Sequence, residues 1–342
     1  MIRKKLFSVI IHMTNPKVLL TRTLPPASQN ILENSSDIEL FHWKDDTVIP
    51  RHELLRRVSG VNGILCMLTE KIDAEVLDAA GPSLKVVSTM SVGYDHVDIN
   101  ELRKRNISLG YTPEVLTEAT ADLTVLLVLA STRRLREGIK TVENGEWSDW
   151  SPTGMLGTQL TNKTIGIVGL GRIGEATAFR LKPFLGTDGK IIYYSPTEKK
   201  RSVILGAKRV EFDSLLEKSD IICICCSLNE KTKEMFNYSV FKKMKKNVIL
   251  VNTARGSIIK QDDLVRALSE GLIGAVGLDV TTPEPLDRNH PLLKFPNVTI
   301  VPHTGSATLE TRTLMGNLAV ENVLCGVRGL SLPNAVCSET LK

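Results

Sequence analysis

Three scarcities in the sequence exclude whole classes of protein. Aromatic residues make up only 5% of the 342 residues, so the net charge of +5 comes without the aromatic-interleaved basic stripe that indicates nucleic-acid binding. No apolar run approaches the roughly 20 residues that span a bilayer, so we expect a soluble protein with no membrane contact. Six cysteines in a chain of this length do not form a disulfide framework.

Three of the cysteines, Cys223, Cys225 and Cys226, crowd into one apolar stretch of strand character. Neighbouring residues on a strand point to opposite faces, so Cys225 and Cys226 cannot both ligate one metal from regular strand geometry. We therefore expect core thiols and no metal site.

The chain begins with MIRKKLFSVIIHM, which is basic and partly apolar. This segment lacks the Ser and Arg richness of a transit peptide. We therefore expect an extension before the first strand, without an assigned function, in a cytoplasmic protein. A mitochondrial protein and a start at Met13 are the alternatives.

Apolar runs of strand length alternate with segments of helical length and periodicity. The runs are KVLLT (17–21), GILCML (63–68), LKVVST (84–89), TIGIVG (164–169), KIIYYS (190–195), DIICICCS (220–227), NVILVN (247–252), IGAVGLDV (273–280) and NVTIVP (297–302). Such alternation indicates parallel sheets covered by helices on both faces, which is an α/β fold.

The length of the chain and the position of its last helix predict two domains. A long helical pattern covers about residues 113–147, and another runs from Thr308 to about Gly326 with no strand after it. That last helix must pack on a domain that is formed by earlier residues. The chain therefore leaves its first domain, forms a second one and returns to the first. We predict a discontinuous substrate domain from residues 1–112 and 305–342, and a dinucleotide-binding domain from residues 113–304, with a cleft between them.

The stretch TIGIVGLGRIGEATAF reads as a strand, a glycine turn and the start of a helix. Gly169 allows the tight turn, Gly171 lets a pyrophosphate approach the backbone, and Gly174 lets the helix pack closely on the strand. The N–H groups of Arg172, Ile173 and Gly174 at the helix start would face the phosphates. We therefore predict a nicotinamide dinucleotide cofactor.

The next strand, KIIYYS, ends without the carboxylate that NAD-specific sites place on the adenosine ribose. Ser195 stands there instead, followed by Lys199, Lys200 and Arg201. A hydroxyl and nearby positive charge suit a 2′-phosphate. We predict a preference for NADPH, with NADH as the alternative.

Three polar residues follow successive later strands. Arg255 follows NVILVN, Glu284 follows IGAVGLDV, and His303 follows NVTIVP. The carboxyl ends of parallel strands share the edge where open α/β sheets bind ligands. An arginine fork can hold a carboxylate, an imidazole can transfer a proton, and a neighbouring carboxylate stabilises its cationic form. Hydride reduction of a 2-keto acid needs these three groups.

The segments GLGRIG, NTARG, GLDVTTPEP and PHTGSA, in this order, resemble the D-isomer-specific 2-hydroxyacid dehydrogenases. STMSVGYDHVD, GYTPEVLTEATAD, NGEWSDW and RNHPLL are similar, more narrowly, to the glyoxylate reductase/hydroxypyruvate reductase branch. The resemblance covers nearly the whole chain from about Lys17. It implies a Rossmann domain inserted in a flavodoxin-like catalytic domain, and a homodimer.

The resemblance also implies residue roles. The substrate-binding positions that it implies are Val92, Gly93, Arg255, His303 and Ser306, with Trp150 reaching the active site of the partner subunit. The catalytic residues that it implies are Arg255, His303 and Glu284. The residues that it implies in contact with the cofactor are Ser227, Thr253, Asp279 and Gly305. The rival histidines His290 and His96 are expected to be structural.

One departure from the branch concerns the end of the KIIYYS strand. Ser195 and Pro196 stand where the branch tends to carry Gly-Arg, so the arginine that would hold a 2′-phosphate is displaced. Lys199 is the candidate substitute.

We expect a reductase that converts glyoxylate to glycolate and hydroxypyruvate to D-glycerate. One alternative is an NADH-dependent phosphoglycerate or other D-2-hydroxyacid dehydrogenase. Another, from a different class, is a dinucleotide-sensing corepressor of the same fold, although the sequence has no dense basic segment to serve as a nuclear signal.

Overall fold

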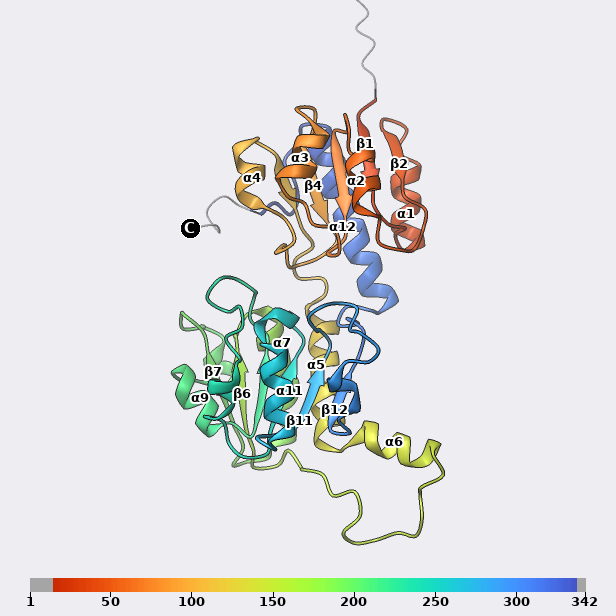
Figure 1. The fold of residues 1–342 in the computed structure, drawn as a ribbon. Coiled ribbons are helices and arrows are strands. Elements are labelled where there is room, and N and C mark those ends of the chain that lie inside the picture. The colour runs from red at the N-terminus through yellow and green to blue at the C-terminus, as the bar shows by residue number, and fades with distance from the viewer. Residues whose placement is uncertain (1–14, 337–342) are drawn as a thin grey trace, which may run out of the picture. The chain divides into compact units, whose positions relative to one another are not determined.

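The computed structural model describes residues 15–336, and the predicted N-terminal extension with its alternative start lies outside them. The chain divides into two compact units: one takes the described residues up to Pro113 and from Thr313 onward, the other is Glu114–Arg312. Figure 1 shows the elements of each. Across residues 15–336, no helix combines the length and apolar character needed to cross a membrane.

The unit Glu114–Arg312 is built on a seven-stranded parallel sheet (Figure 1). Its strands are β6 (Thr164–Val168), β7 (Lys190–Tyr194), β8 (Lys208–Arg209), β9 (Ile221–Ile224), β10 (Val248–Asn252), β11 (Ile273–Leu278) and β12 (Val298–Ile300). Their order is β12-β11-β10-β9-β6-β7-β8. This is the doubly wound order of a Rossmann domain with one added strand, and the winding reverses between β6 and β9.

Helices cover both faces of this sheet. The helices of this unit are α5 (Thr117–Thr132), α6 (Leu135–Glu143), α7 (Arg172–Leu181), α8 (Ser202–Leu205), α9 (Phe212–Lys218), α10 (Tyr238–Phe241) and α11 (Gln261–Ser269), with short 3-10 helices η1 (Lys182–Leu185), η2 (Gly256–Ile258) and η3 (Pro291–Lys294); α6 extends from the unit and does not cover the sheet. In β9, Ile222 and Ile224 pack with α9, α10 and α11. Ile221 and Cys223 pack with α5, α7 and α8. Burial on both faces explains why these strands are apolar without interruption.

The other unit has a five-stranded parallel sheet of order β2-β1-β3-β4-β5. Its elements are β1 (Lys17–Leu20), α1 (Pro26–Glu33), β2 (Glu39–His42), α2 (Arg51–Arg57), β3 (Gly63–Cys66), α3 (Ala74–Ala80), β4 (Val86–Thr89), α4 (Ile99–Lys104), β5 (Ser108–Gly110) and α12 (Leu309–Val327). This strand order is that of flavodoxin.

The last helix, α12, packs on this five-stranded sheet. The Ser88 hydroxyl donates to the Ala319 carbonyl at 2.8 Å, and a Cβ added at Gly63 would lie 2.7 Å from Cγ1 of Val327. The predicted fold class, a Rossmann domain inserted in a flavodoxin-like domain, is confirmed. The residue boundaries that we assigned to the two domains stay a prediction.

The long helical pattern at 113–147 is not one helix. It breaks between α5 and α6, where Arg134 has the left-handed value φ 53°. An arginine carries no sequence signal for such a break, because glycine or asparagine usually supplies it.

The cysteines of the described residues are free thiols. Burial raises the pKa of the Cys226 thiol to about 11 and that of Cys225 to about 12. Both are therefore un-ionised at neutral pH, although these two residues are partly buried at the margin of the core.

Candidate active site

The glycine turn joins β6 to α7 at the point where the winding of the sheet reverses. Gly169 has φ 92°, and a Cβ there would lie 2.6 Å from the Cα of Cys226. A Cβ at Gly174 would lie 2.2 Å from the carbonyl oxygen of Gly169, so only glycine permits this packing. A Cβ at Gly171 would meet nothing within 4 Å. The backbone N–H groups of Arg172–Gly174 therefore have room for a pyrophosphate, and the residues fit a dinucleotide.

The turn after β7 is tied to this glycine turn. Ser195 is only 3% exposed, and its Oγ accepts a hydrogen bond from the Leu170 N–H at 2.9 Å. The backbone N–H of Lys199 donates to Oη of Tyr193 at 3.2 Å, and the lysine side chain is partly exposed. Ser195 thus stabilises the glycine turn through a buried hydrogen bond. The backbone of Lys199 is also held in place by a hydrogen bond.

Glu284 and His303 face each other from the turns that follow β11 and β12. Oε2 of Glu284 lies 2.7 Å from Nδ1 of His303, and Oε1 accepts the Thr281 N–H at 3.0 Å. Burial opposes ionisation of Glu284, but its hydrogen bonds with His303 and Thr281, and the charges of His303 and Arg255, outweigh burial and lower its pKa. Glu284 is therefore ionised at neutral pH, and it occupies Nδ1 of His303 rather than Nε2.

The backbone of His303 is held in an uncommon conformation. Its φ is 53°, and its N–H donates to the carbonyls of Asp279 at 2.9 Å and Val301 at 3.1 Å. The Asp279 carboxylate accepts the N–H groups of Thr304 at 2.5 Å and Gly305 at 2.9 Å. Burial raises the pKa of Asp279. A left-handed histidine persists only where its surroundings hold it, and Asp279 organises those surroundings.

Arg255 lies between β10 and η2, in a turn stabilised by Asn252, whose Nδ2 donates to the Arg255 carbonyl at 2.9 Å. A Cβ at the next residue, Gly256, would lie 1.9 Å from the carbonyl oxygen of Thr281. Only glycine permits so close an approach, and the turn that contains Arg255 therefore packs against the loop that carries Glu284. The charge of Arg255 accordingly contributes to the lowered pKa of Glu284.

Gln261, which sequence reasoning missed, fastens the loop that carries Glu284. Its Oε1 accepts the Thr282 N–H at 2.9 Å, and its Nε2 donates to the Thr282 carbonyl at 2.6 Å. Nε2 also lies 3.1 Å from Nε2 of His290, whose Nδ1 accepts the Leu292 N–H at 3.2 Å. His290 thus fixes this loop, as predicted. Gln261 gave no signal because its partner is 21 residues away.

The remaining predicted cofactor positions lie at the same edge of the sheet. Oγ1 of Thr253, just past β10, is 2.7 Å from Oγ1 of Thr124 in α5. Ser227 follows β9, and its carbonyl accepts the Thr232 hydroxyl at 2.8 Å. The carbonyl of Ser306, which we predicted to bind substrate, accepts Nε of Arg312 at 3.3 Å.

Val92 and Gly93 lie in the other unit, in the turn after β4. The Ser91 hydroxyl donates to the Gly93 carbonyl at 2.6 Å and lies 2.8 Å from Oγ1 of Thr89, which is 3.0 Å from Nε2 of His96. His96 therefore braces this turn. Contact of Val92 and Gly93 with a substrate stays a prediction.

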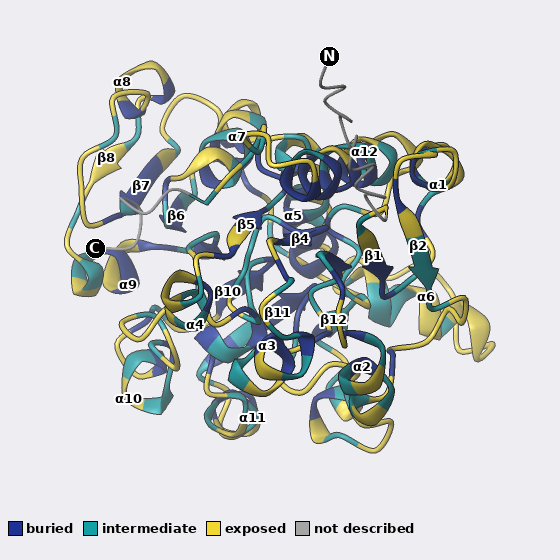
Figure 2. Ribbon diagram, turned by 90° about the horizontal axis from the view of Figure 1, so that it is seen from above, coloured by how far each residue is buried: buried dark blue, intermediate teal, exposed yellow. Residues whose placement is uncertain are grey.

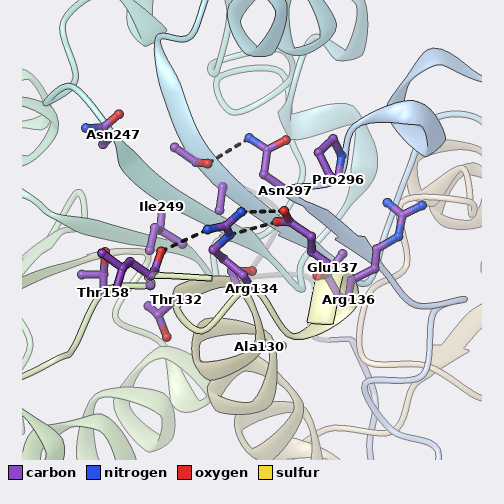
Figure 3. A pocket seen from close by; sticks show the side chains of 16 residues that line it. Ala130, Thr132, Arg134, Arg136, Glu137, Thr158, Asn247, Ile249, Pro296 and Asn297 are labelled. Carbon is purple, nitrogen blue, oxygen red and sulfur yellow. Dashed lines mark hydrogen bonds and ion pairs between the residues drawn. The ribbon is translucent and has the colours of Figure 1, made fainter. Parts of the chain in front are cut away.

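A cavity of about 390 Å³ lies at the opposite, amino-terminal edge of the seven-stranded sheet (Figure 3). Arg134, Glu137, Asn247 and Asn297 are among its lining residues, and none of the predicted site residues is. Within residues 15–336, no group of three or more His, Cys, Asp and Glu side chains could hold a metal ion.

The cluster at the carboxyl edge can therefore bind a dinucleotide, hold an anion and transfer a proton. Gly169, Asp279, Arg255, Glu284 and His303 all belong to one unit. In open α/β sheets this edge, beside the reversal of winding, is where ligands bind.

Comparison with known proteins agrees with this chemistry. Residues 125–305 match the model of the D-isomer specific 2-hydroxyacid dehydrogenase, NAD binding domain. The human glyoxylate reductase/hydroxypyruvate reductase is 46% identical over 318 residues, which is 93% of this chain and 97% of that protein.

Two solved structures share the fold over nearly their full length. A glyoxylate reductase from Paecilomyes thermophila superposes with a TM-score of 0.84 and 31% identity, covering 96% of this chain and 100% of that one. An NADPH-dependent glyoxylate/hydroxypyruvate reductase from Sinorhizobium meliloti, in complex with NADP and malonate, has a TM-score of 0.80 and 29% identity, covering 95% and 97%.

The matched family model, the identity over nearly the whole length and the shared fold confirm the resemblance seen in the sequence motifs. The chain belongs to the D-isomer-specific 2-hydroxyacid dehydrogenase family and is an NAD(P)-dependent dehydrogenase of its glyoxylate reductase/hydroxypyruvate reductase branch.

Proposed function

We propose that this enzyme reduces glyoxylate to glycolate and hydroxypyruvate to D-glycerate, with NADPH as the preferred cofactor, in the cytoplasm. The observation that carries the proposal is the 2.7 Å contact between Glu284 and His303, with the charge of Arg255 acting on the same carboxylate. The names of the human and Sinorhizobium meliloti relatives support this substrate class.

Arg255 holds the substrate carboxylate with two parallel N–H donors, which a lysine cannot supply. The backbone N–H groups of Val92 and Gly93 and the side chain of Ser306 complete the polar contacts. The nicotinamide, when bound, supplies the hydride that adds to the carbonyl carbon. Nε2 of His303 donates a proton to the carbonyl oxygen.

Glu284 acts through His303. Its lowered pKa keeps it ionised, so a negative charge faces Nδ1 of His303 and stabilises the imidazolium before proton transfer. In the oxidative direction the same imidazole takes the proton back. The backbone contacts of Asp279 hold the imidazole at the position where this exchange occurs.

The preference for NADPH rests on the turn after β7, where no carboxylate stands at the strand end. Ser195 and Lys199 are there instead, with the phosphate-binding turn of Gly169, Gly171 and Gly174 beside them. The NADP-bound relative from Sinorhizobium meliloti supports the same cofactor.

Initial rates test the proposed function. Glyoxylate, hydroxypyruvate, pyruvate and 3-phosphohydroxypyruvate are each assayed with NADPH and with NADH. Higher kcat/KM for the first two substrates with NADPH is the expected result. Faster turnover of the phosphorylated substrate with NADH would favour a phosphoglycerate dehydrogenase, and negligible turnover of all four would favour a dinucleotide-sensing corepressor.

The arm, residues 135–160, supports a homodimer. Figure 1 shows the chain from α6 to β6 extending from its unit. The guanidinium of Arg136 anchors the arm by donating to the carbonyls of Leu293 at 2.8 Å, Phe295 at 3.0 Å and Val298. The segment is therefore held at its base.

The arm displays an apolar face. Leu135, Ile139 and Val142 recur at helical spacing in α6 and are 47%, 48% and 58% exposed, and no residue of α6 is buried (Figure 2). Trp150, farther along the arm, is 85% exposed. An exposed apolar face of this kind marks a protein contact. We propose a second copy of the chain as the partner, with Trp150 reaching the partner's active site.

Replacing Ile139 with glutamate is expected to shift the enzyme from dimer to monomer and to lower turnover, because a charge on the apolar face of the arm opposes its burial. Light scattering coupled to size-exclusion chromatography measures the mass. The matched control is Ile31→Glu, since Ile31 is 45% exposed on α1. A dimer that persists at micromolar concentration in the Ile139 variant would contradict the proposed interface.

Replacing Gln261 with alanine is expected to lower kcat by about 10-fold with little change in the affinity for NADPH, because two hydrogen bonds to the Thr282 backbone are lost. Stopped-flow rates and fluorescence titration measure the two quantities. Gln261→Glu serves as a comparison, because its carboxylate can accept the Thr282 N–H but repels the Thr282 carbonyl. An unchanged kcat in both variants would remove Gln261 from the positioning of Glu284.

A further inference from the structure

Arg209 fastens the turn that follows β7. Its Nε donates to the Ser195 carbonyl at 3.0 Å, and its Nη2 donates to the Pro196 carbonyl at 3.0 Å. Arg209 ends β8, where its Cα pairs with that of Tyr193 in β7. Its side chain therefore reaches toward the carboxyl end of β7, the turn where a dinucleotide-binding domain receives the adenosine ribose.

The other positive charges of this turn are held differently. Nη1 of Arg201 lies 3.6 Å from Oε2 of Glu175, so this arginine already faces a carboxylate. Lys199 is anchored through its backbone N–H and its carbonyl, which accepts the Ser202 hydroxyl at 2.6 Å, and its flexible side chain must lose rotamer freedom on binding a ligand. Ser195 uses its Oγ to accept the Leu170 N–H.

Arg209 has a guanidinium plane that is already oriented by two carbonyls. Among the residues that the structure describes, its Nη1 has no hydrogen-bond or ion-pair partner, and the residue is exposed. A fixed guanidinium suits phosphate recognition because less entropy is lost for each hydrogen bond formed.

We propose that Arg209 is the residue that selects NADPH over NADH, with Nη1 donating to the 2′-phosphate while Nε and Nη2 keep hold of the turn. This inference rests on the proposed cofactor preference and names its determinant. It also accounts for the departure from the branch at Ser195 and Pro196. The arginine missing from the end of β7 is replaced by one that comes from the neighbouring strand.

Dissociation constants test the proposal. NADPH and NADH are titrated by fluorescence into the full-length enzyme, and adenosine 2′,5′-bisphosphate and AMP are titrated by calorimetry as fragments that differ only by the 2′-phosphate. Arg209→Ala is expected to weaken the binding of NADPH and of the 2′,5′-bisphosphate about 10- to 100-fold, the loss of one or two charge-assisted hydrogen bonds, and to change the binding of NADH and AMP by less than about 3-fold.

Two further variants sharpen the result. Lys208→Ala removes the neighbouring positive charge on the same strand, where the side chain points to the other face, so it is expected to leave the ratio of the two dissociation constants unchanged. Arg209→Lys retains the charge but cannot bridge two carbonyls, so an intermediate ratio is expected. Thermal melting checks that each variant is folded.

Equal weakening of NADPH and NADH in Arg209→Ala would overturn the proposal, because the guanidinium would then only shape the turn. An unchanged ratio of the two constants would overturn it as well. A wild-type enzyme that turns over faster with NADH contradicts the proposed cofactor preference instead, and the effect of Arg209→Ala on the ratio still decides whether Arg209 contacts the 2′-phosphate.

Discussion

Replacing His303 with alanine is expected to lower kcat for glyoxylate reduction by about 100-fold or more, the usual contribution of a positioned general acid. The affinity for NADPH should stay unchanged, because the phosphate-binding turn lies between β6 and α7 and does not involve the imidazole. Initial rates at saturating substrate measure the first quantity and fluorescence titration measures the second.

Two further variants separate a loss of proton transfer from a general disturbance of the protein structure. Glu284→Gln keeps an acceptor for Nδ1 of His303 but removes the charge. A smaller loss of kcat than in the His303 variant is therefore expected. His52→Ala, at a histidine whose side chain is 81% exposed on α2, should have no effect. Near-wild-type turnover in the His303 variant would remove this residue from the mechanism.

Replacing Arg255 with lysine is expected to lower kcat/KM for glyoxylate by about 100-fold, since a lysine offers a point charge where the substrate carboxylate needs two parallel donors. Most of the loss should appear in KM if the arginine holds the substrate equally in the ground and transition states. Steady-state kinetics at saturating NADPH separates the two parameters.

The matched control for this change is Arg288→Lys, at an exposed arginine in the segment between Glu284 and η3. It should retain wild-type kinetics. If Arg255→Lys matched the wild type in kcat/KM while both proteins bound NADPH equally, the carboxylate would be held by other groups.

Within residues 15–336, the apolar runs identified nine of the strands, because each contains buried apolar residues. The three strands that were missed are β2 and β8, which have no buried residue, and β5, which is only three residues long. In β8 both residues, Lys208 and Arg209, are exposed, so no apolar pattern marks them. These residues form a strand because their backbone pairs with that of β7, and a local sequence pattern cannot show this pairing.

Motif spacing placed Arg255, Glu284 and His303 beyond the ends of successive strands, and parallel strands present their carboxyl ends on one edge. The contacts that hold these residues at their positions were not predictable in this way. No local sequence feature marks Gly256, yet its lack of a Cβ is what lets the arginine turn touch Thr281. No local sequence feature marks Gln261 either, yet its amide hydrogen-bonds both the N–H and the carbonyl of Thr282.

The sequence alone determined the α/β class and the dinucleotide turn, and it supplied the candidate residues for proton transfer, carboxylate binding and phosphate binding, because strand burial, glycine requirements and side-chain chemistry are local properties. The tertiary structure decided which of these groups meet: that Nδ1 of His303 faces Glu284, and that the guanidinium of Arg209 lies against the turn of Ser195. Such pairings depend on the order and register of strands far apart in the chain, and a local pattern carries no information about either.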